Sequence, residues 1–212
     1  MEKLGSFVLH EACKAAASWP TVEAFPLKIA VNVSPVQFFR QDLARLVETA
    51  LSLTGLAPSR LEIEITESML MRDAKRSARI LREISALGVS IAIDDFGTGY
   101  SSLSYLKRFP LNKLKIDRSF VNDIEHDASD QQIGKAIVGL GRSLGLSIVA
   151  EGVETVGQRN ILAGYGCNSL QGFLYAKAMP SDTITPFILK QMHARMCHFA
   201  ETPSADAGSS SG

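Results

Sequence analysis

Short apolar runs alternate with longer amphipathic stretches along most of the chain. The runs are rich in Val and Ile and are bounded by turn residues, a pattern typical of buried β-strands. We expect six strands, at residues 27–33, 61–66, 89–93, 114–117, 146–151 and 169–173. Apolar residues at helical spacing, with Pro and Gly as stop signals, predict helices between them. These helices are expected at residues 4–19, 35–53, 72–87, 100–109, 130–144, 155–165 and 180–197.

The alternation of strand and helix predicts an α/β fold with parallel strands and right-handed helical crossovers. Two architectures satisfy this alternation. One is an open, doubly wound sheet, and the other is a closed barrel of eight strands. The barrel would be two strands short, because the pattern accounts for only six.

A polar or charged residue stands at or near the C-terminal end of each expected strand. These residues are Asn32, Glu64, Asp94 with Asp95, Lys115, Glu151 and Gln171. Polar loops explain one or two of them, but Glu64 and Lys115 have apolar neighbours on both sides. Strand C-termini converge on one mouth in a barrel, whereas they spread along an edge in an open sheet. A polar residue at every strand end therefore favours the barrel.

The chemistry of these residues points to a metal site. Asn32, Glu64, Asp94 and Asp95 offer only hard oxygen ligands, which suit magnesium, manganese or calcium. Adjacent aspartates can serve two ions that lie about 3.5–4 Å apart. Lys115 would bring positive charge to a phosphate oxyanion, and a carboxylate at residue 151 could ligate an ion or orient a water molecule. This set of residues predicts cleavage of a phosphate ester.

The segment around Asp94 and Asp95 has two other interpretations. Adjacent aspartates also commonly end a strand and begin a turn. The Gly-x-Gly at 97–99 follows a strand, and Asp117 ends the next one, which is similar to a dinucleotide-binding motif. Against that motif, Ser102 replaces its third glycine, and the two aspartates would repel a pyrophosphate group.

Composition narrows the class of protein. The 212 residues are 46% hydrophobic and 21% charged, which suits one globular domain with a sizeable core. The 22 basic and 22 acidic residues leave no net charge, so we expect no DNA or RNA polymer and no membrane surface as partner. Three scattered cysteines suit a reducing compartment. With no signal peptide or membrane-spanning run, we expect a cytoplasmic protein, or the cytoplasmic part of a larger, membrane-anchored one.

Five segments carry a resemblance to a known family. They are NVSPVQF, LEIEITES, IAIDDFGTGYSSLSYLKRFPLNKLKIDRSFV, IVAEGVET and LQGFLYAKAMP. In order and spacing they resemble the EAL-domain cyclic-di-GMP phosphodiesterases over about residues 4–192. The resemblance implies a TIM-like (β/α) barrel, hydrolysis of cyclic di-GMP to linear pGpG, two Mg²⁺ or Mn²⁺ ions and a homodimer. It places an EAL-type domain at residues 1–198, truncated at its N-terminus, and leaves a disordered tail at 199–212.

The resemblance also implies roles for individual residues. One ion would be held by Asn32, Glu64 and Asp94, and the second by Asp94 and Asp95. The pair that handles the attacking water would be Lys115 and Glu151, with Gln171 close by.

A loop at residues 95–102 shapes the second metal site in this family and links it to the dimer surface. Glu67 and Glu154 are expected to support this loop. Gly97 and Gly99 would allow it to move.

The chain departs from the family pattern in three places. The Glu-Ala-Leu segment that names the family, whose Glu ligates metal, is absent, and Glu23-Ala24-Phe25 lies in a loop that cannot replace it. An Arg that follows this segment in the family is absent too. Ala176 and Ala178 stand where the family usually has Ser and Pro.

The family's first two strands are expected to precede Leu4, and they would bring the strand count to eight. A barrel without them has two unpaired edges. We therefore expect the chain alone to be weakly stable or to self-associate, with residues 27–33 as one open edge. We also expect weak or no hydrolysis, since one carboxylate ligand is missing. The alternative is a non-catalytic relic of an EAL domain that binds cyclic di-GMP or a protein partner.

Overall fold

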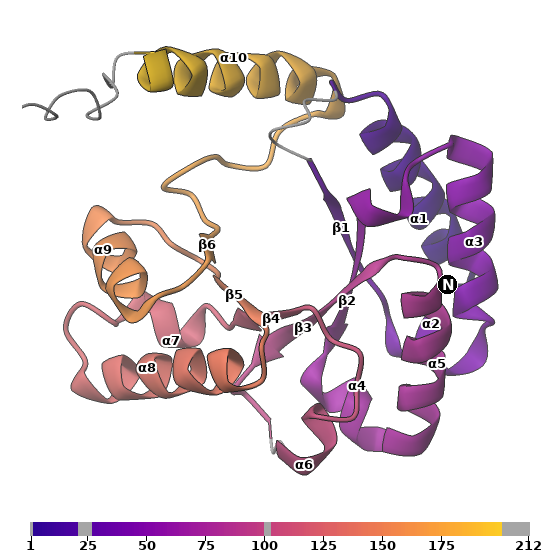
Figure 1. Cartoon of the computed structure of the whole chain (residues 1–212), viewed down its shortest axis with the longest axis horizontal. Coiled ribbons are helices and arrows are strands. Elements are labelled where there is room, and N and C mark those ends of the chain that lie inside the picture. Colours follow the sequence, from indigo (N-terminus) through magenta and orange to yellow (C-terminus); the bar gives the residue numbers. More distant parts are fainter. Residues whose placement is uncertain (1, 21–26, 100–102, 201–212) are drawn as a thin grey trace, which may run out of the picture.

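A single curved sheet organises the fold. The computed structural model describes residues 2–20, 27–99 and 103–200. Within these residues six parallel strands pair in sequence order. They are β1 (Ile29–Asn32), β2 (Leu61–Thr66), β3 (Ser90–Phe96), β4 (Lys113–Ile116), β5 (Ser147–Ala150) and β6 (Ser169–Leu170). The sheet curls into a half-barrel (Figure 1), which confirms the incomplete barrel and excludes the open, doubly wound sheet.

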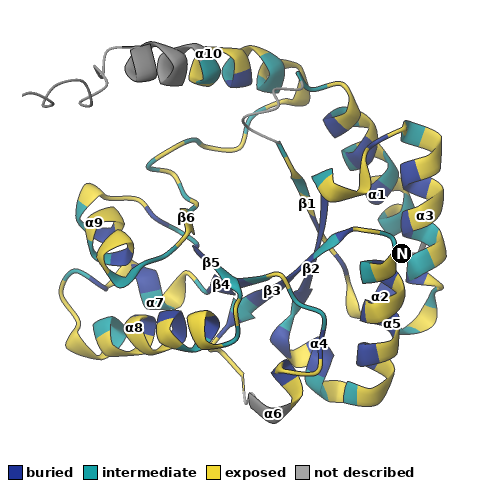
Figure 2. Cartoon of the chain, in the orientation of Figure 1, coloured by how far each residue is buried: buried dark blue, intermediate teal, exposed yellow. Residues whose placement is uncertain are grey.

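Most helices cover the outer face of the sheet, whereas α10 follows β6 and stands apart from the sheet (Figure 2). The longer ones are α1 (Glu2–Ala17), α3 (Leu43–Thr54), α5 (Ala74–Ala86), α8 (Ala128–Ser143), α9 (Val156–Tyr165) and α10 (Ser181–Ala200). The shorter ones are α2 (Pro35–Arg40), η1 (Pro58–Arg60), α4 (Glu67–Arg72), α6 (Leu103–Leu106) and α7 (Ser119–Asn122). No helix in the described part of the chain is both long and apolar enough to cross a bilayer.

One predicted helix is interrupted by an aspartate that caps a new helix. The helix predicted at 35–53 starts as expected, because Ser34 caps it and forms a capping box with Gln37. It then ends at Arg40, and the Asp42 side chain caps α3. Asp73 likewise caps α5, which confirms the helix predicted at 72–87, whereas the short helix α4 before it was not predicted. Asp accepts hydrogen bonds from the first free N–H groups of a helix, so it favours a restart over continuation.

Three predictions fall partly or wholly outside the described residues. The helix predicted at 100–109 is described only from Leu103, as α6. The segment at 23–25 is not described. At the other end, α10 runs to Ala200, which is inside the tail predicted at 199–212, and residues 201–212 are not described.

Side chains on the two faces of the sheet differ in polarity. Ile63 and Ile65 on β2 are fully buried, and they alternate with Glu62 and Glu64. Successive side chains of a strand point to opposite faces, so the glutamates share the face away from the isoleucines. On β5, Ile148 lies against α8, where a Cβ at Gly141 would be 2.8 Å from its Cγ1. The apolar core therefore lies between sheet and helices, and charged residues line the inside of the half-barrel.

Two buried ion pairs are stacked on that inner face. Lys113 Nζ lies 2.7 Å from Glu62 Oε1, and Lys115 Nζ lies 2.7 Å from Glu64 Oε1. Each pair joins β2 to β4 across β3. On β3 the small residue Ala92 is in register with Glu64 of β2 on one side and with Lys113 of β4 on the other. The ion pair nearer the C-terminal ends of the strands, Glu64–Lys115, belongs to the site described below.

The Glu62–Lys113 pair gives a first prediction. Lys113→Met should lower the free energy of unfolding by about 2 kcal/mol, because it leaves Glu62 buried without a partner. The loss is smaller than for a fully buried pair, since 24% of the Lys113 side chain is exposed. The double variant Glu62→Met, Lys113→Met should regain most of this stability, and urea unfolding measures both. Equal destabilisation of the single and double variants would rule out the charge explanation.

The sheet has an edge at each end. β1 and β6 are the terminal strands, and neither has a second partner strand among the described residues. This places β1 at an edge, as predicted for residues 27–33. Self-association through that edge stays a prediction.

Candidate active site

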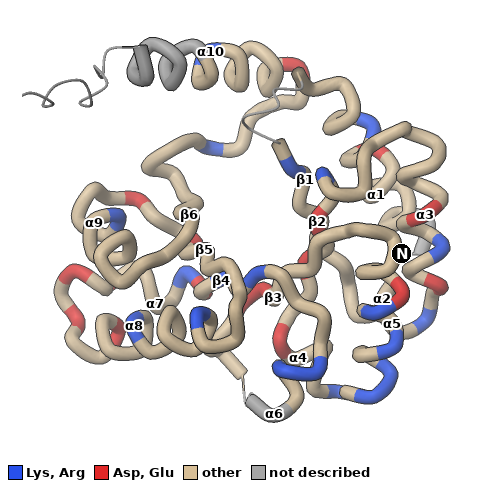
Figure 3. The backbone as a smooth tube through the Cα atoms, in the orientation of Figure 1, with Lys and Arg blue, Asp and Glu red and all other residues tan. Residues whose placement is uncertain are grey.

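The centre of the site is the ammonium group of Lys115 on β4. Its Nζ lies 2.7 Å from Glu64 Oε1, 3.0 Å from Asp94 Oδ1 and 2.7 Å from Glu151 Oε1. Only 4% of the Lys115 side chain is exposed. The three carboxylates come from β2, β3 and the end of β5, where acidic and basic segments meet in Figure 3. The structure thus brings four of the sequence-predicted site residues together at one rim.

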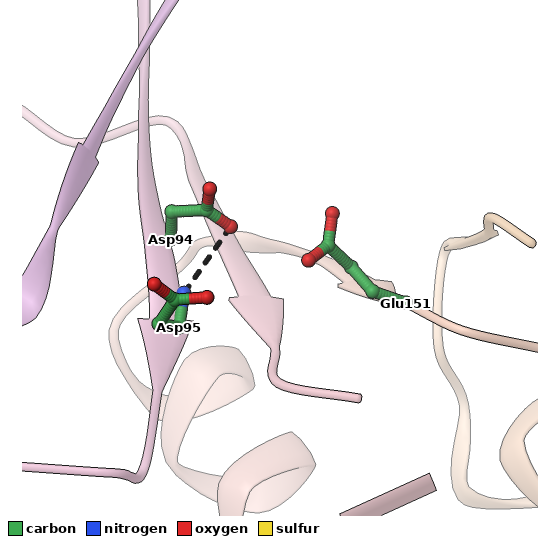
Figure 4. Close-up of side chains that lie close together, drawn as sticks. All are labelled: Asp94, Asp95 and Glu151. Carbon is green, nitrogen blue, oxygen red and sulfur yellow. Dashed lines mark hydrogen bonds between the residues drawn. The ribbon is translucent and has the colours of Figure 1, made fainter. Parts of the chain in front are cut away.

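A distortion of β3 turns two consecutive carboxylates toward this rim. The β3–β4 register shifts between Ile93 and Phe96, and Asp95 has a φ of 52°. In a regular strand Asp94 and Asp95 would point to opposite faces, whereas a bulge re-aims a side chain. Oxygen atoms of Asp94, Asp95 and Glu151 all lie within 4.8 Å of one another (Figure 4). The backbone N–H of Asp95 also donates to Asp94 Oδ1 at 3.2 Å, as drawn in Figure 4.

Buried negative charge dominates the electrostatics of the rim. Burial raises the pKa of Glu64 and of Glu151, and the Lys115 ammonium group offsets only part of this effect. Burial alone would lower the pKa of Lys115, but its hydrogen bonds to Glu151 and Glu64 raise the pKa above its ordinary value. Lys115 therefore stays positively charged. The carboxylates around it leave the rim with a surplus of negative charge.

Sequence reasoning gave Asp117 no role in the metal site. Asp117 follows β4, and its carboxylate lies close enough to that of Asp95 for each to shift the pKa of the other. Burial and the charges of Asp94 and Asp117 raise the pKa of Asp95. Burial acts in the same sense on Asp117, but hydrogen bonds from Ser119 outweigh it and lower the pKa. The sequence contained one indication that Asp117 belongs to the site. Asp117 lies two positions after Lys115, and residues two apart in an extended segment point to the same face.

Asn32 joins the rim through Glu64. Its side-chain Nδ2 donates to Glu64 Oε2 at 3.0 Å. The amide oxygen of Asn32 remains a further hard donor at the same strand end. The structure thus places Asn32 beside the carboxylates with which it was predicted to bind metal.

A hollow of about 220 Å³ opens beside Glu151. Its lining includes Arg118, Glu154, Gln171 and Phe173. Gln171 thus lies next to Glu151, as predicted, although it is exposed and follows β6. Glu154 is exposed, and no described hydrogen bond joins its side chain to the loop that it was predicted to support.

Glu67 holds the start of that loop. Only 2% of Glu67 is exposed, and its Oε2 accepts a hydrogen bond from the backbone N–H of Gly97 at 3.1 Å. Gly97 has a φ of 102°, and a Cβ there would lie 2.8 Å from the Phe120 ring. A Cβ at Gly99 would lie 3.0 Å from Glu67 Oε1. Both glycines let the backbone pass close to the residues that surround it.

Replacing Glu67 tests this anchor. Glu67→Ala should lower the free energy of unfolding by about 1–3 kcal/mol, because it leaves the Gly97 N–H without this acceptor. Amide hydrogen exchange should accelerate in peptides that contain Gly97. The matched variant Glu67→Gln keeps an acceptor oxygen and should exchange like wild type. Unchanged exchange in Glu67→Ala would show that other contacts fix the loop.

The donor set fits hard divalent cations. Among the described residues the rim gathers five carboxylates, three of which contact the Lys115 ammonium group; the five are Glu64, Asp94, Asp95, Asp117 and Glu151. In the cluster of Asp94, Asp95 and Glu151, the possible ligand atoms lie within 4.8 Å of one another. This cluster contains no His or Cys, which argues against zinc and copper. Bound cations would compensate the surplus buried negative charge. The residues present therefore fit divalent metal ions.

Comparison with known sequences identifies relatives over most of the chain. A family model described as "EAL domain" matches residues 1–178. A bifunctional diguanylate cyclase/cyclic di-GMP phosphodiesterase, MucR of Pseudomonas aeruginosa, is 52% identical over 182 residues, which is 86% of this chain and 27% of that protein. Cyclic di-GMP phosphodiesterase NbdA of the same organism is 40% identical over 188 residues, 89% of this chain and 24% of that protein. The chain spans about a quarter of the length of these relatives.

Solved structures share the fold. The PaMucR phosphodiesterase in complex with c-di-GMP has a TM-score of 0.82 and 52% identity, covering 86% of this chain and 74% of that chain. The EAL domain of Mycobacterium smegmatis DcpA has a TM-score of 0.81 and 37% identity, covering 89% and 85%. Klebsiella pneumoniae BlrP1 in a manganese and cyclic di-GMP complex has a TM-score of 0.75 and 31% identity, covering 83% and 44%.

Proposed function

Because this chain belongs to the EAL domain family, we propose that it hydrolyses cyclic di-GMP to linear pGpG with the help of two Mg²⁺ or Mn²⁺ ions. The observation that carries the proposal is the rim itself. Lys115 and the carboxylates of Glu64, Asp94 and Glu151 meet there from four strands. That combination suits a reaction in which a phosphate group gains negative charge beside bound cations.

The first proposed role of the rim residues is to bind the metal ions. Asn32, Glu64, Asp94 and Asp95 would hold the ions, with Glu151 within reach of the aspartates. When bound, the ions polarise the phosphate and lower the pKa of a coordinated water molecule. The reaction adds water across one P–O bond, so that the product carries a terminal 5′-phosphate and a free 3′-hydroxyl group.

Lys115 and Glu151 act on the reacting groups directly. The Lys115 ammonium group stays protonated and can stabilise the negative charge that develops on the phosphate oxygens. The Glu151 carboxylate, whose pKa burial raises, suits the acceptance of a proton from the attacking water. Gln171, next to Glu151 in the same hollow, would help to position that water.

The hollow beside Glu151 offers a place for the rest of the substrate. Arg118 can pair with the second phosphate group, because a guanidinium group matches two phosphate oxygens. The Phe173 ring is 58% exposed and can stack on a guanine base. We propose that these two residues hold the half of cyclic di-GMP that does not react.

A turnover assay tests the proposed function. The chain is incubated with cyclic di-GMP and Mn²⁺, and chromatography follows the formation of pGpG. We expect slow turnover that EDTA abolishes, since these 212 residues contain no Glu-Ala-Leu segment. Binding without turnover would favour the non-catalytic alternative, a domain that only senses cyclic di-GMP or docks a partner. The absence of both binding and turnover would contradict the proposal.

A homodimer and a cytoplasmic role in cyclic di-GMP signalling complete the proposal. The homodimer is what the family resemblance implies, and the cytoplasmic location fits the scattered cysteines, which suit a reducing compartment. Light scattering of the purified chain should give twice the mass of 22.9 kDa. A mass of one chain at micromolar concentration would contradict the dimer.

A further inference from the structure

Helix α5 separates two surface hollows that differ in charge. The hollow toward the start of α3 is lined by two cations and two carboxylates, which are Asp42, Arg76, Arg79 and Glu83. The hollow toward α6 has a volume of about 180 Å³ and is lined by three cations, Lys75, Arg82 and Arg108, and by no carboxylate. We call this second hollow the α5–α6 groove. Figure 3 shows basic segments recurring along α5.

The cations of the α5–α6 groove are not neutralised by any carboxylate in the part of the chain that the structure describes. None of Lys75, Arg82 and Arg108 forms an ion pair with another residue that the structure describes. Arg79, on the other side of α5, has Glu83 3.9 Å away. Asp73 precedes α5, but its carboxylate caps the helix by accepting from the Arg76 N–H at 3.1 Å. Three like charges around one concave surface favour the binding of an anion.

The side chains of the groove suit phosphate groups. A guanidinium group presents paired N–H donors that match two phosphate oxygens, and Arg82 and Arg108 supply two such groups. The Arg108 guanidinium lies 5.6 Å from the centre of the Tyr105 ring, which restricts its orientation. Lys75, in the first turn of α5, adds charge where the helix dipole also favours an anion.

We propose that the α5–α6 groove binds a small molecule that carries a diphosphate or triphosphate group. The groove is concave and small, so a compact phosphate chain fits it better than a flat lipid surface. This site lies outside the half-barrel, and its ligand does not depend on the hydrolytic function proposed above.

The position of the groove connects it to the active-site loop. Helix α5 follows α4 directly, and Glu67 of α4 accepts the hydrogen bond from Gly97. Helix α6 follows the loop. A ligand held by Lys75, Arg82 and Arg108 would therefore join α6, which follows the loop, to α5, which follows the helix that carries Glu67. Its binding should slow amide hydrogen exchange in α6.

Calorimetry with pyrophosphate in EDTA tests the proposal. EDTA removes divalent cations, so that metal-dependent binding at the rim does not contribute. We expect saturable binding that Arg82→Gln and Arg108→Gln each weaken about tenfold or more, as loss of one charge-assisted hydrogen bond implies. The matched control is Arg79→Gln, which removes the same charge from the same helix on the neutralised side. It should bind pyrophosphate within about twofold of wild type, since Glu83 already offsets that charge.

Three outcomes would overturn the proposal. One is the absence of saturable binding at millimolar pyrophosphate. The second is an equal loss in Arg79→Gln and Arg82→Gln, which would indicate a diffuse basic surface. The third is binding to vesicles of phosphatidylglycerol and phosphatidylcholine without binding of pyrophosphate. Slower exchange in α6 on addition of pyrophosphate, absent in Arg108→Gln, would support the link to the loop.

Discussion

Lys115→Met should destabilise the metal-free protein by about 3–5 kcal/mol, because it leaves a cluster of buried carboxylates without its cation. Glu64, Asp94 and Glu151 all lie within 3.0 Å of the Lys115 ammonium group. Methionine keeps most of the length of the side chain but carries no charge, so the effect reports electrostatics more than packing. Urea unfolding in EDTA measures the loss.

Added Mn²⁺ should reduce this loss. A bound cation stabilises the folded state according to its concentration and affinity, and the variant has more uncompensated negative charge for it to neutralise. The control is Lys107→Met, since Lys107 is exposed and forms no ion pair with another described residue. That variant should unfold like wild type at every Mn²⁺ concentration. If Mn²⁺ stabilised Lys115→Met no more than wild type, the carboxylates would not be acting as a cation site.

Asp94→Asn should remove metal binding and turnover while leaving the fold intact. Asp94 lies at the centre of the acidic group, beside Lys115, Asp95 and Glu151. The substitution keeps the shape of the side chain and removes its negative charge. Loss of a residue that only supports a metal ligand costs about 10–100-fold in affinity, so loss of a ligand should cost at least that much.

Calorimetry with Mn²⁺ and the pGpG assay measure the two losses. The matched control is Asp123→Asn, which removes one acidic charge at an exposed position just after α7. Its Mn²⁺ affinity and turnover should equal those of wild type. Circular dichroism should show the same secondary structure in all three proteins. Wild-type Mn²⁺ affinity in Asp94→Asn would exclude Asp94 as a ligand.

The hydrophobic periodicity was sufficient to predict the strands. The polar residues at their C-terminal ends were sufficient to predict that these ends meet at one rim. β2 has the predicted bounds, because LEIEIT is a β-branched alternating run closed by a helix. Glu64 and Lys115 were informative for a physical reason: a charged residue inside an apolar strand is costly unless a partner faces it. The structure supplies that partner, since each neutralises the other.

Other features depend on contacts between strands, which a single sequence does not specify. The bulge that turns Asp95 toward Asp94 depends on the register of β3 against β4. The proximity of the Asp95 and Asp117 carboxylates depends on the same pairing. The Glu62–Lys113 pair was missed because each residue looks like an ordinary strand position until β2 and β4 lie on either side of β3.

Helix breaks and short helices were missed for local reasons. Asp42 lies inside an amphipathic pattern that continues across it, so periodicity alone predicts one helix there. The capping propensity of Asp was the available signal. α7 has four residues, too few to show a helical period.

Anomalous diffraction from crystals grown with Mn²⁺ tests the metal site most directly. We predict anomalous peaks at the rim, bounded by oxygen atoms of Asp94, Asp95 and Glu151, with Glu64 and Asn32 adjoining them. Ligand distances should be about 2.0–2.6 Å, the range for hard divalent cations. A map with Mn²⁺ at other acidic positions and none between these carboxylates would contradict the metal site, and with it the proposed hydrolysis.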